Sequence, residues 1–388
     1  MNKPKTIGYL ANTSWFLYHF RLADMKAAQR CGVRVVAVAP KDEYSDRFKD
    51  EGIEFYPIPL KRRDFTPWGK LKAIRELRKI HRRESIDLMH HFTLEAILVG
   101  TMAAGRNGPK VIQSVAGMGF VYAENGFSQR VLRLILNPIL GWCLPKGPII
   151  VENRGDAARI RKIVGKRLRY PIEQLPGGGI DVGWYTPEGG QLLQNDSSKV
   201  RFLSAGRLLK GKGPGLFAQA AAKYSGPPAE FFLAGMPDKG NPEAYSRQEI
   251  EEWNRISGFK WLGNVEDIPS LLRSVDVLVH PTFYGEGLPR IIMEAQACGL
   301  PVITTNIPAC AEAVADGING WVLDRKDPGK LADLMTSCGL SVGKRNEMGK
   351  LNRIQAIETF DQEKVIRRTL EVYRNHFPDW NPKVGEIE

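Results

Sequence analysis

The most informative segment of this sequence reads Tyr284-Gly-Glu-Gly-Leu-Pro-Arg-Ile-Ile-Met-Glu-Ala-Gln-Ala-Cys-Gly299. It follows a short apolar run at residues 277–280, which has the composition of a buried strand. Pro289 suits the first position of a helix, and Gly299 suits the residue just past its end. The segment therefore predicts a strand, a glycine-bearing loop and a helix, the repeating unit of a parallel α/β sheet.

The same alternation of short apolar runs and helical patterns surrounds this stretch in the second half of the chain. Further strands are expected at residues 200–205, 230–234, 259–262 and 301–304. The first half repeats the pattern, with strands expected at residues 6–10, 33–39, 55–58, 88–91 and 110–114. Strand, helix and strand at this spacing indicate parallel sheets with crossover helices.

Glycines and polar residues between the halves, at residues 177–198, are typical of a linker. The expected fold class is therefore α/β, with two Rossmann-like, doubly wound domains at residues 1–180 and 181–360 that face a central cleft. Such a cleft is the usual place for a ligand. From its length, the final helix, residues 361–380, is expected to fold back onto the first domain.

Composition agrees with a two-domain globular protein. The chain has 388 residues, of which 43% are hydrophobic and 25% are charged. The formal net charge of +12 favours an anionic partner, such as nucleic acid, a phosphate-bearing substrate or a membrane surface. Five scattered cysteines favour a reducing compartment over a disulfide framework or a structural zinc site. We expect neither a signal peptide nor a membrane-spanning helix.

The loop at residues 284–289 points to an anion-binding site. A loop before a helix frees backbone N–H groups, which together with the helix dipole suit a diphosphate. Glu286 and Glu294 would repel phosphate, so their carboxylates are expected to accept hydrogen bonds from sugar or ribose hydroxyls. The alternative is an ordinary strand, loop and helix with solvated glutamates.

The segment Ser204-Ala-Gly-Arg-Leu-Leu-Lys-Gly-Lys-Gly213 follows the first strand of the second half. Arg207 and Lys212 are placed where strand ends open into the expected cleft. Two cations there would neutralise a leaving diphosphate, although a basic surface turn explains them equally simply.

Taken in order, four motifs resemble one family. They are the junction at 177–181, Gly206-Arg207 with Lys212-Gly213, Glu286 and Glu294 with seven residues between them, and the segments 306–312 and 316–320. Together they resemble the retaining glycosyltransferases of family 4, which have the GT-B architecture. The resemblance covers almost the whole second domain.

The resemblance implies a role for each matching residue. Arg207 and Lys212 would contact the donor phosphates, Glu286 would lie beside the transferred sugar, and Glu294 would bind the ribose. Residues 262–268 would wall the base. The implied donor-binding set is Gly206, Gly263, Asn264, Val265, Gly285, Gly287, Leu288, Pro289 and Glu294. The family needs no metal, retains the anomeric configuration and has no assigned side-chain nucleophile, so we expect no cofactor beyond a UDP-sugar donor.

The first domain carries His90-His-Phe-Thr93 and Ser114-Val-Ala-Gly-Met-Gly-Phe-Val-Tyr122. These stretches resemble a subgroup that extends undecaprenyl-diphosphate-linked oligosaccharides, often with an N-acetylhexosamine. The resemblance implies transfer from a UDP-sugar to a polyprenyl-diphosphate-linked saccharide in cell-surface polysaccharide or glycan assembly. The acceptor-side candidates are Asn12, His19, Arg21, His90, His91, Gly117 and Gly119. The alternative for the two adjacent histidines is that they cap a strand.

Two stretches favour docking to an anionic membrane surface. Residues 61–63 and 70–83 are rich in lysine and arginine, and residues 127–144 are apolar with two arginines. We therefore expect a cytoplasmic protein that lies peripherally on the inner membrane. The alternatives are a solvated helix face for the charges and a core helix interrupted at Pro138 for the apolar stretch.

Other functions agree less well with the sequence. A UDP-sugar epimerase shares the architecture but not this motif set. A nucleic-acid-binding protein agrees with the charge, but no recognition motif is present, so nucleic acid is not an expected partner. A dehydrogenase is disfavoured because G-x-G-x-x-G does not follow the first strand.

Overall fold

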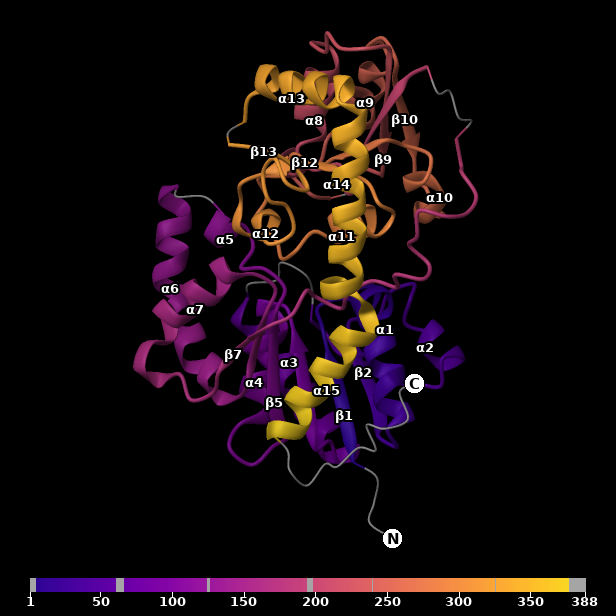
Figure 1. The fold of residues 1–388 in the computed structure, drawn as a ribbon. Helices are drawn as coiled ribbons and strands as arrows, with labels where there is room; N and C mark the ends of the chain where they lie inside the picture. The colour runs from indigo at the N-terminus through magenta and orange to yellow at the C-terminus, as the bar shows by residue number, and fades with distance from the viewer. Residues whose placement is uncertain are drawn as a thin grey trace. The chain divides into compact units, whose positions relative to one another are not determined.

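A computed structural model describes residues 5–60, 66–123, 126–193, 198–238, 240–324 and 326–376 of the chain. The chain divides into two compact units (Figure 1). The first unit comprises Met1–Gly178 together with Glu363–Glu388, and the second comprises Gly179–Gln362. Each unit contains one parallel sheet covered by helices.

The first unit has a seven-stranded parallel sheet with the order β3-β2-β1-β4-β5-β6-β7. Its strands are β1 (Thr6–Leu10), β2 (Arg34–Ala39), β3 (Glu54–Pro57), β4 (Leu88–Phe92), β5 (Lys110–Val115), β6 (Ile149–Val151) and β7 (Ile172–Gln174). Its helices are α1 (Ser14–Arg30), α2 (Arg47–Asp50), α3 (Pro67–Arg83), α4 (Leu94–Ala104), α5 (Phe120–Ala123), α6 (Phe127–Cys143), α7 (Arg154–Val164) and α15 (Gln362–His376).

The second unit has a six-stranded parallel sheet with the order β10-β9-β8-β11-β12-β13. Its strands are β8 (Val200–Ala205), β9 (Ala229–Ala234), β10 (Phe259–Gly263), β11 (Val277–Val279), β12 (Val302–Thr305) and β13 (Gly320–Leu323). Its helices are α8 (Pro214–Ala221), α9 (Arg247–Trp253), α10 (Ile268–Leu272), α11 (Arg290–Ala297), α12 (Pro308–Ala311), α13 (Pro328–Leu340) and α14 (Val342–Gln355).

Burial explains why the central segments form strands. All five residues of β1 are buried, as are all six of β8, because helices cover both faces of each sheet. Helix starts are set by side-chain caps: Thr13 Oγ1 accepts from the Phe16 backbone N–H at 3.1 Å, and Asp327 caps α13 in the same way. The pattern read from the sequence is thus the pattern of the parallel sheets.

Helix α15 joins the first unit although it lies at the far end of the sequence (Figure 1). Val365, Ile366, Leu370 and Tyr373 are buried on its inner face. The Tyr373 hydroxyl lies 2.6 Å from Nδ1 of His90 and donates to the Tyr9 hydroxyl at 3.3 Å. A buried polar chain therefore fixes this helix against β1 and β4.

Both sheets reverse their strand order beside the first strand of the unit. In the first unit the reversal lies between β1 and β4, and in the second it lies between β8 and β11. The loops that follow these strand pairs diverge to opposite faces of the sheet, which opens a crevice at the carboxyl ends of the strands. Ligands of doubly wound folds bind at such a point, so the site is sought there.

Some elements differ from the sequence expectation. The short strands β6, β7 and β13 were not expected, since three or four residues show little periodicity. Helix α6 continues through Pro138 rather than stopping there. Pro289 is the N-cap of α11 rather than its first residue, whereas Gly299 has the expected left-handed backbone with φ of 74°.

Candidate active site

The candidate active site of the second unit is formed by the loops that follow β8 and β11. These strands are hydrogen-bonded neighbours, with Val277 opposite Phe202 and Leu278 opposite Leu203. Because parallel strands end at one edge of the sheet, Lys212 after β8 and Glu286 after β11 come together there. The two residues are 74 positions apart in the sequence.

Close backbone packing locks the two loops together. Gly213 has a φ of 79°, and a Cβ atom at this position would lie only 2.2 Å from the carbonyl oxygen of Pro281. The Phe283 N–H donates to the Gly211 carbonyl at 2.8 Å. Only glycine tolerates both the left-handed backbone and this approach, so Gly213 fixes the position of Lys212.

The Lys212 ammonium forms an ion pair with Oε2 of Glu286. The other carboxylate oxygen, Oε1, accepts from Thr282 Oγ1 at 3.1 Å and lies 3.8 Å from Nε2 of His280. Burial by itself raises the pKa of Glu286, but the charge of Lys212 and the hydrogen bonds outweigh it and lower the pKa to about 2. Glu286 is therefore a carboxylate at every physiological pH.

His280 and Thr282 were not among the residues singled out from the sequence. His280 is only 3% exposed, and burial is the main cause that lowers its pKa, so the imidazole is neutral. Both residues come directly after β11, where side chains point toward the ligand crevice of a parallel sheet. Their position just after a predicted strand is the sequence feature that would have identified both residues.

Arg207, predicted to contact the donor phosphates, lies just after β8. Its guanidinium donates to Oδ2 of Asp238 at 3.2 Å, and its side chain is 43% exposed. Gly206, immediately before it, is exposed and has a φ of 142°. The structure thus places a solvent-accessible cation on the same strand end as Lys212.

Glu294, predicted to bind ribose, lies on α11 and is 7% exposed. Its Oε1 accepts from Nε of Arg290 at 2.8 Å, one helical turn earlier. A ribose that reached Glu294 would therefore share this carboxylate with Arg290. Tyr185 is a further neighbour of Glu294: burial, followed by the charge of Glu294, raises the pKa of the Tyr185 phenol far above its ordinary value.

The remaining donor-side candidates lie at strand ends and at the start of α11. Gly263 ends β10 with a φ of 73°, followed by exposed Asn264 and half-buried Val265. The Gly235 N–H donates to the Gly263 carbonyl at 2.7 Å, which adds Gly235 to this edge. The loop residues before α11 are half-buried at Gly285 and buried at Gly287, Leu288 and Pro289.

The two candidate histidines of the first unit lie within β4, not at its end. His90 is 1% exposed, and its Nε2 lies 2.7 Å from the Ser114 hydroxyl. His91 is fully buried, and its two ring nitrogens lack a hydrogen-bond partner. The reading of these residues as strand caps is therefore wrong, and β4 holds both of them inside the unit because its two faces are covered.

The other acceptor-side candidates occupy different environments. Gly117 and Gly119 follow β5 and have φ values of 88° and 70°, which favour glycine. Asn12 is half-buried in the turn after β1, and His19 is exposed on α1. Arg21 is 4% exposed and pairs with Asp24 at 3.2 Å, so contact with an acceptor would require this pair to open.

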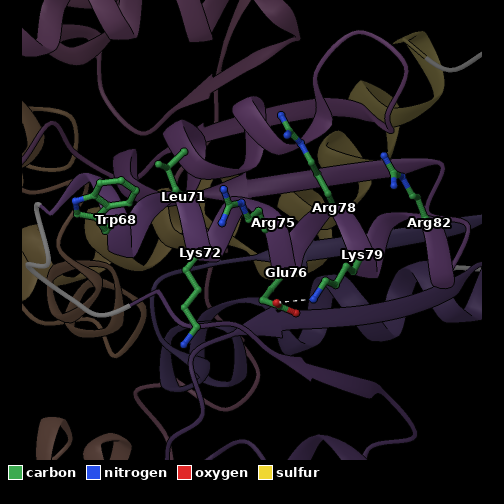
Figure 2. Close-up of a pocket in the computed structure, with 8 residues that line it drawn as sticks. All are labelled: Trp68, Leu71, Lys72, Arg75, Glu76, Arg78, Lys79 and Arg82. Atoms are coloured by element: carbon green, nitrogen blue, oxygen red, sulfur yellow. Dashed lines mark hydrogen bonds and ion pairs between the residues drawn. The ribbon is translucent and has the colours of Figure 1, made fainter.

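Helix α3 of the first unit carries a basic strip along one face. Its inner face is apolar and buried at Ala73, Ile74, Leu77 and Ile80. Its outer face borders a groove of about 640 Å³ (Figure 2). The residues that line the groove are Trp68, Leu71, Lys72, Arg75, Glu76, Arg78, Lys79 and Arg82. We call this set the α3 strip, and its charge suits phosphate groups.

Helix α6 exposes an apolar face. The exposed fractions are 84% for Phe127, 76% for Leu134 and 58% for Ile135, with Val131 and Trp142 on the same helical face. Its other face packs into the unit through Leu140 and Cys143. Among the described helices, none is both long and apolar enough to cross a membrane.

The geometry of the second unit defines what it can do chemically. A buried carboxylate suits sugar hydroxyls, two cations suit a diphosphate, and a helix start suits anionic oxygens. Within the described part of the chain, no group of three or more His, Cys, Asp or Glu side chains is arranged to hold a metal ion. The groups of this site are therefore suited to bind a sugar that is joined to a diphosphate.

Comparisons with known proteins identify the family of the chain. A "Glycosyl transferase 4-like" model matches residues 6–144, and a "Glycosyl transferases group 1" model matches residues 191–354. The chain is 25% identical to N,N'-diacetylbacillosaminyl-diphospho-undecaprenol alpha-1,3-N-acetylgalactosaminyltransferase of Campylobacter jejuni, over 95% of this chain and 98% of that enzyme. It is 26% identical to UDP-Gal:alpha-D-GlcNAc-diphosphoundecaprenol alpha-1,3-galactosyltransferase of Escherichia coli, over 72% of this chain and 73% of that enzyme.

Solved structures show the same fold. The structure of Anabaena Alr3699/HepE in complex with UDP and glucose matches with a TM-score of 0.74 and 19% identity, over 96% of this chain and 100% of that one. The GT-B fold expected from the motifs is therefore confirmed. Since the two models together cover most of the chain, it belongs to the glycosyltransferases of group 1.

Proposed function

We propose that this glycosyltransferase moves a hexose or N-acetylhexosamine from a UDP-sugar to a saccharide carried on a polyprenyl diphosphate. The observation that carries the proposal is the Lys212–Glu286 pair where the second sheet reverses its strand order. Bound donor phosphate would compete for Lys212, and a sugar hydroxyl would take its place on Glu286. In this role Arg207 and Lys212 stabilise the negative charge of the departing UDP.

Two relatives support UDP as the nucleotide. The HepE structure was solved with UDP and glucose, and the name of the Escherichia coli relative specifies UDP-Gal. In this chain, the base would lie beside residues 262–268 and the ribose beside Glu294. The backbone N–H groups of Gly287 and Leu288, just before α11, would hold the diphosphate.

The acceptor is proposed from the relatives that match the first unit as well as the second. Both the Campylobacter jejuni and the Escherichia coli enzymes are named for saccharides on diphospho-undecaprenol. The match to the former covers nearly the whole chain, including the unit to which we assign acceptor binding. A role in cell-surface polysaccharide or glycan assembly follows from such an acceptor.

A polyprenyl acceptor requires the enzyme to reach a membrane surface. The exposed apolar face of α6 suits insertion among lipid headgroups, and the α3 strip suits their phosphates (Figure 2). The basic residues 61–63, predicted to take part, lie outside the described residues. We therefore propose peripheral binding to the cytoplasmic face of an anionic membrane.

The direct test is a transfer assay with a panel of UDP-sugars and undecaprenyl-diphosphate-linked saccharides. One UDP-sugar should give a product that retains its anomeric configuration, and EDTA should leave the rate unchanged. Transfer only from a purine nucleotide sugar would contradict the assignment of the donor. Conversion of a UDP-sugar to its epimer without an acceptor would instead identify a sugar-nucleotide epimerase.

A further inference from the structure

An aromatic cluster lies on the first unit at the carboxyl ends of β1 and β2. Trp15 is 42% exposed, and its ring lies 5.1 Å from that of His19. The His19 ring in turn lies 4.8 Å from that of Tyr44. Trp15 and His19 come from the first two turns of α1, and Tyr44 comes from the loop after β2. We call these three residues the aromatic platform.

Hydrogen bonds to Asp42 hold the backbone of the platform in place. The Asp42 carboxylate accepts from the backbone N–H groups of Ser14 at 3.0 Å and Trp15 at 3.2 Å, and from that of Tyr44 at 2.9 Å. One carboxylate thus ties the start of α1 to the loop after β2. The Arg47 guanidinium, at the start of α2 in the same segment as Tyr44, lies 4.6 Å from the centre of the Tyr44 ring and packs against it.

One end of the platform borders the point where the first sheet reverses its strand order. The first sheet reverses its order between β1 and β4, and the loop after β1 leads directly into Trp15. A single exposed tryptophan is ordinary on a protein surface. Three neighbouring rings at this edge, with the half-buried Asn12 three residues before Trp15, are a different observation, because rigid aromatic surface lowers the entropy lost on binding.

The chemistry of the platform suits a neutral saccharide. The rings are tilted against one another, by 48° between Trp15 and His19 and by 68° between His19 and Tyr44, so a pyranose would stack its C–H face on one ring, that of Trp15. The polar atoms of His19, Tyr44 and Asn12 suit the hydroxyls of the sugar. Deep membrane insertion suits this surface less well, because an imidazole and the nearby Arg47 guanidinium would have to lose water. The exposed apolar face of α6 has no such mixture.

We propose that Trp15, His19 and Tyr44 bind the saccharide of the acceptor, which rests on the transferase function proposed above. Trp15 stacks on one sugar ring and sets the affinity for the acceptor. The platform shares no residue with the donor site proposed in the second unit. The enzyme therefore recognises the sugar of its acceptor as well as the lipid and diphosphate.

The kinetic test uses an acceptor with a short, water-soluble prenyl chain and no vesicles. Trp15→Ala should raise the acceptor KM about tenfold, whereas Trp15→Phe, which keeps a ring, should raise it about threefold or less. The donor KM and the slow hydrolysis of the UDP-sugar without acceptor should not change. Trp184→Ala is the control, since Trp184 is also exposed and lies in neither site. An unchanged acceptor KM in Trp15→Ala would overturn the proposal.

A binding measurement tests whether the platform binds a saccharide, even if no transfer activity is found. In protein labelled with fluorotryptophan, the Trp15 resonance is the one that disappears in Trp15→Phe. It should shift on titration with methyl glycosides of hexoses and N-acetylhexosamines, and it should not shift with UDP. A shift with anionic vesicles but with no glycoside would identify a membrane anchor and overturn the proposal. Loss of transfer with a persisting glycoside shift would count against the proposed function alone.

Discussion

The ammonium of Lys212 and the carboxylate of Glu286 form an ion pair between loops that follow neighbouring strands. Their side chains are 13% and 18% exposed, so the pair is largely withdrawn from water. Such a pair keeps a cation and a carboxylate ready for phosphate and hydroxyl groups, respectively. Replacement of water by fixed polar groups before the substrate arrives is an established source of rate acceleration.

Glu286→Gln should lower kcat at least about 10²-fold, because a neutral amide cannot stabilise the same charge distribution. Circular dichroism should remain that of the wild type, since the amide is isosteric. Glu252→Gln, at an exposed position on α9, is the matched control and should transfer at the wild-type rate. Full activity in Glu286→Gln with the true substrates would remove Glu286 from the active site.

Gly213→Ala should lower both stability and transfer. A left-handed backbone costs a non-glycine residue about 1–2 kcal/mol. The added Cβ would also lie 2.2 Å from the Pro281 carbonyl oxygen and would displace Lys212. Gly343→Ala on α14 is the control, because no heavy atom lies within 4 Å of its Cβ and alanine favours a helix. Equal thermal melting of the two variants would contradict this account.

The free energy of unfolding should fall when the pH falls below about 6.5. Burial lowers the pKa of His81 to about 4 and that of His91 to about 3, whereas an unfolded histidine titrates near 6.5. The unfolded chain therefore takes up protons first, at a cost of about 1.4 kcal/mol per pH unit for each histidine. The stability is fully present above pH 6.5 and is lost as the pH falls toward 4.

Urea denaturation at pH 7 and pH 5 measures this effect. His81→Leu should reduce the difference between the two pH values, even if the leucine changes the stability at pH 7. His81 is suitable because neither ring nitrogen has a hydrogen-bond partner to lose. If the pH dependence of His81→Leu equals that of the wild type, this histidine is not responsible.

Leu134→Glu should weaken sedimentation with vesicles that contain phosphatidylglycerol, because it places a charge in the exposed apolar face of α6. Arg75→Glu in the α3 strip should weaken the same binding, chiefly at low salt, since this contribution is electrostatic. Ile318→Glu is the control, because Ile318 is 63% exposed in the second unit. Equal losses in all three variants would contradict the assigned surfaces.

Much of the fold was predictable from local patterns. The strands at residues 200–205 and 6–10 were recognised because residues buried on both faces of a parallel sheet give short, mainly apolar runs, here interrupted only by single polar residues such as Arg201. Motif spacing identified the family, which the comparisons confirm. The strands β6 and β13 were missed because the sheet around them, rather than their own three or four residues, decides that they are strands.

Local patterns were enough to predict the α/β class, the family and the residue types that we propose for donor binding, because periodicity and motif spacing are properties of short segments. The tertiary structure decided which of those residues meet. The register of β8 against β11 brings Lys212 to Glu286, and the packing of α15 brings Tyr373 to His90 across 283 positions. Such contacts depend on the close packing of whole elements, and no local pattern encodes the distance between two side chains far apart in the chain.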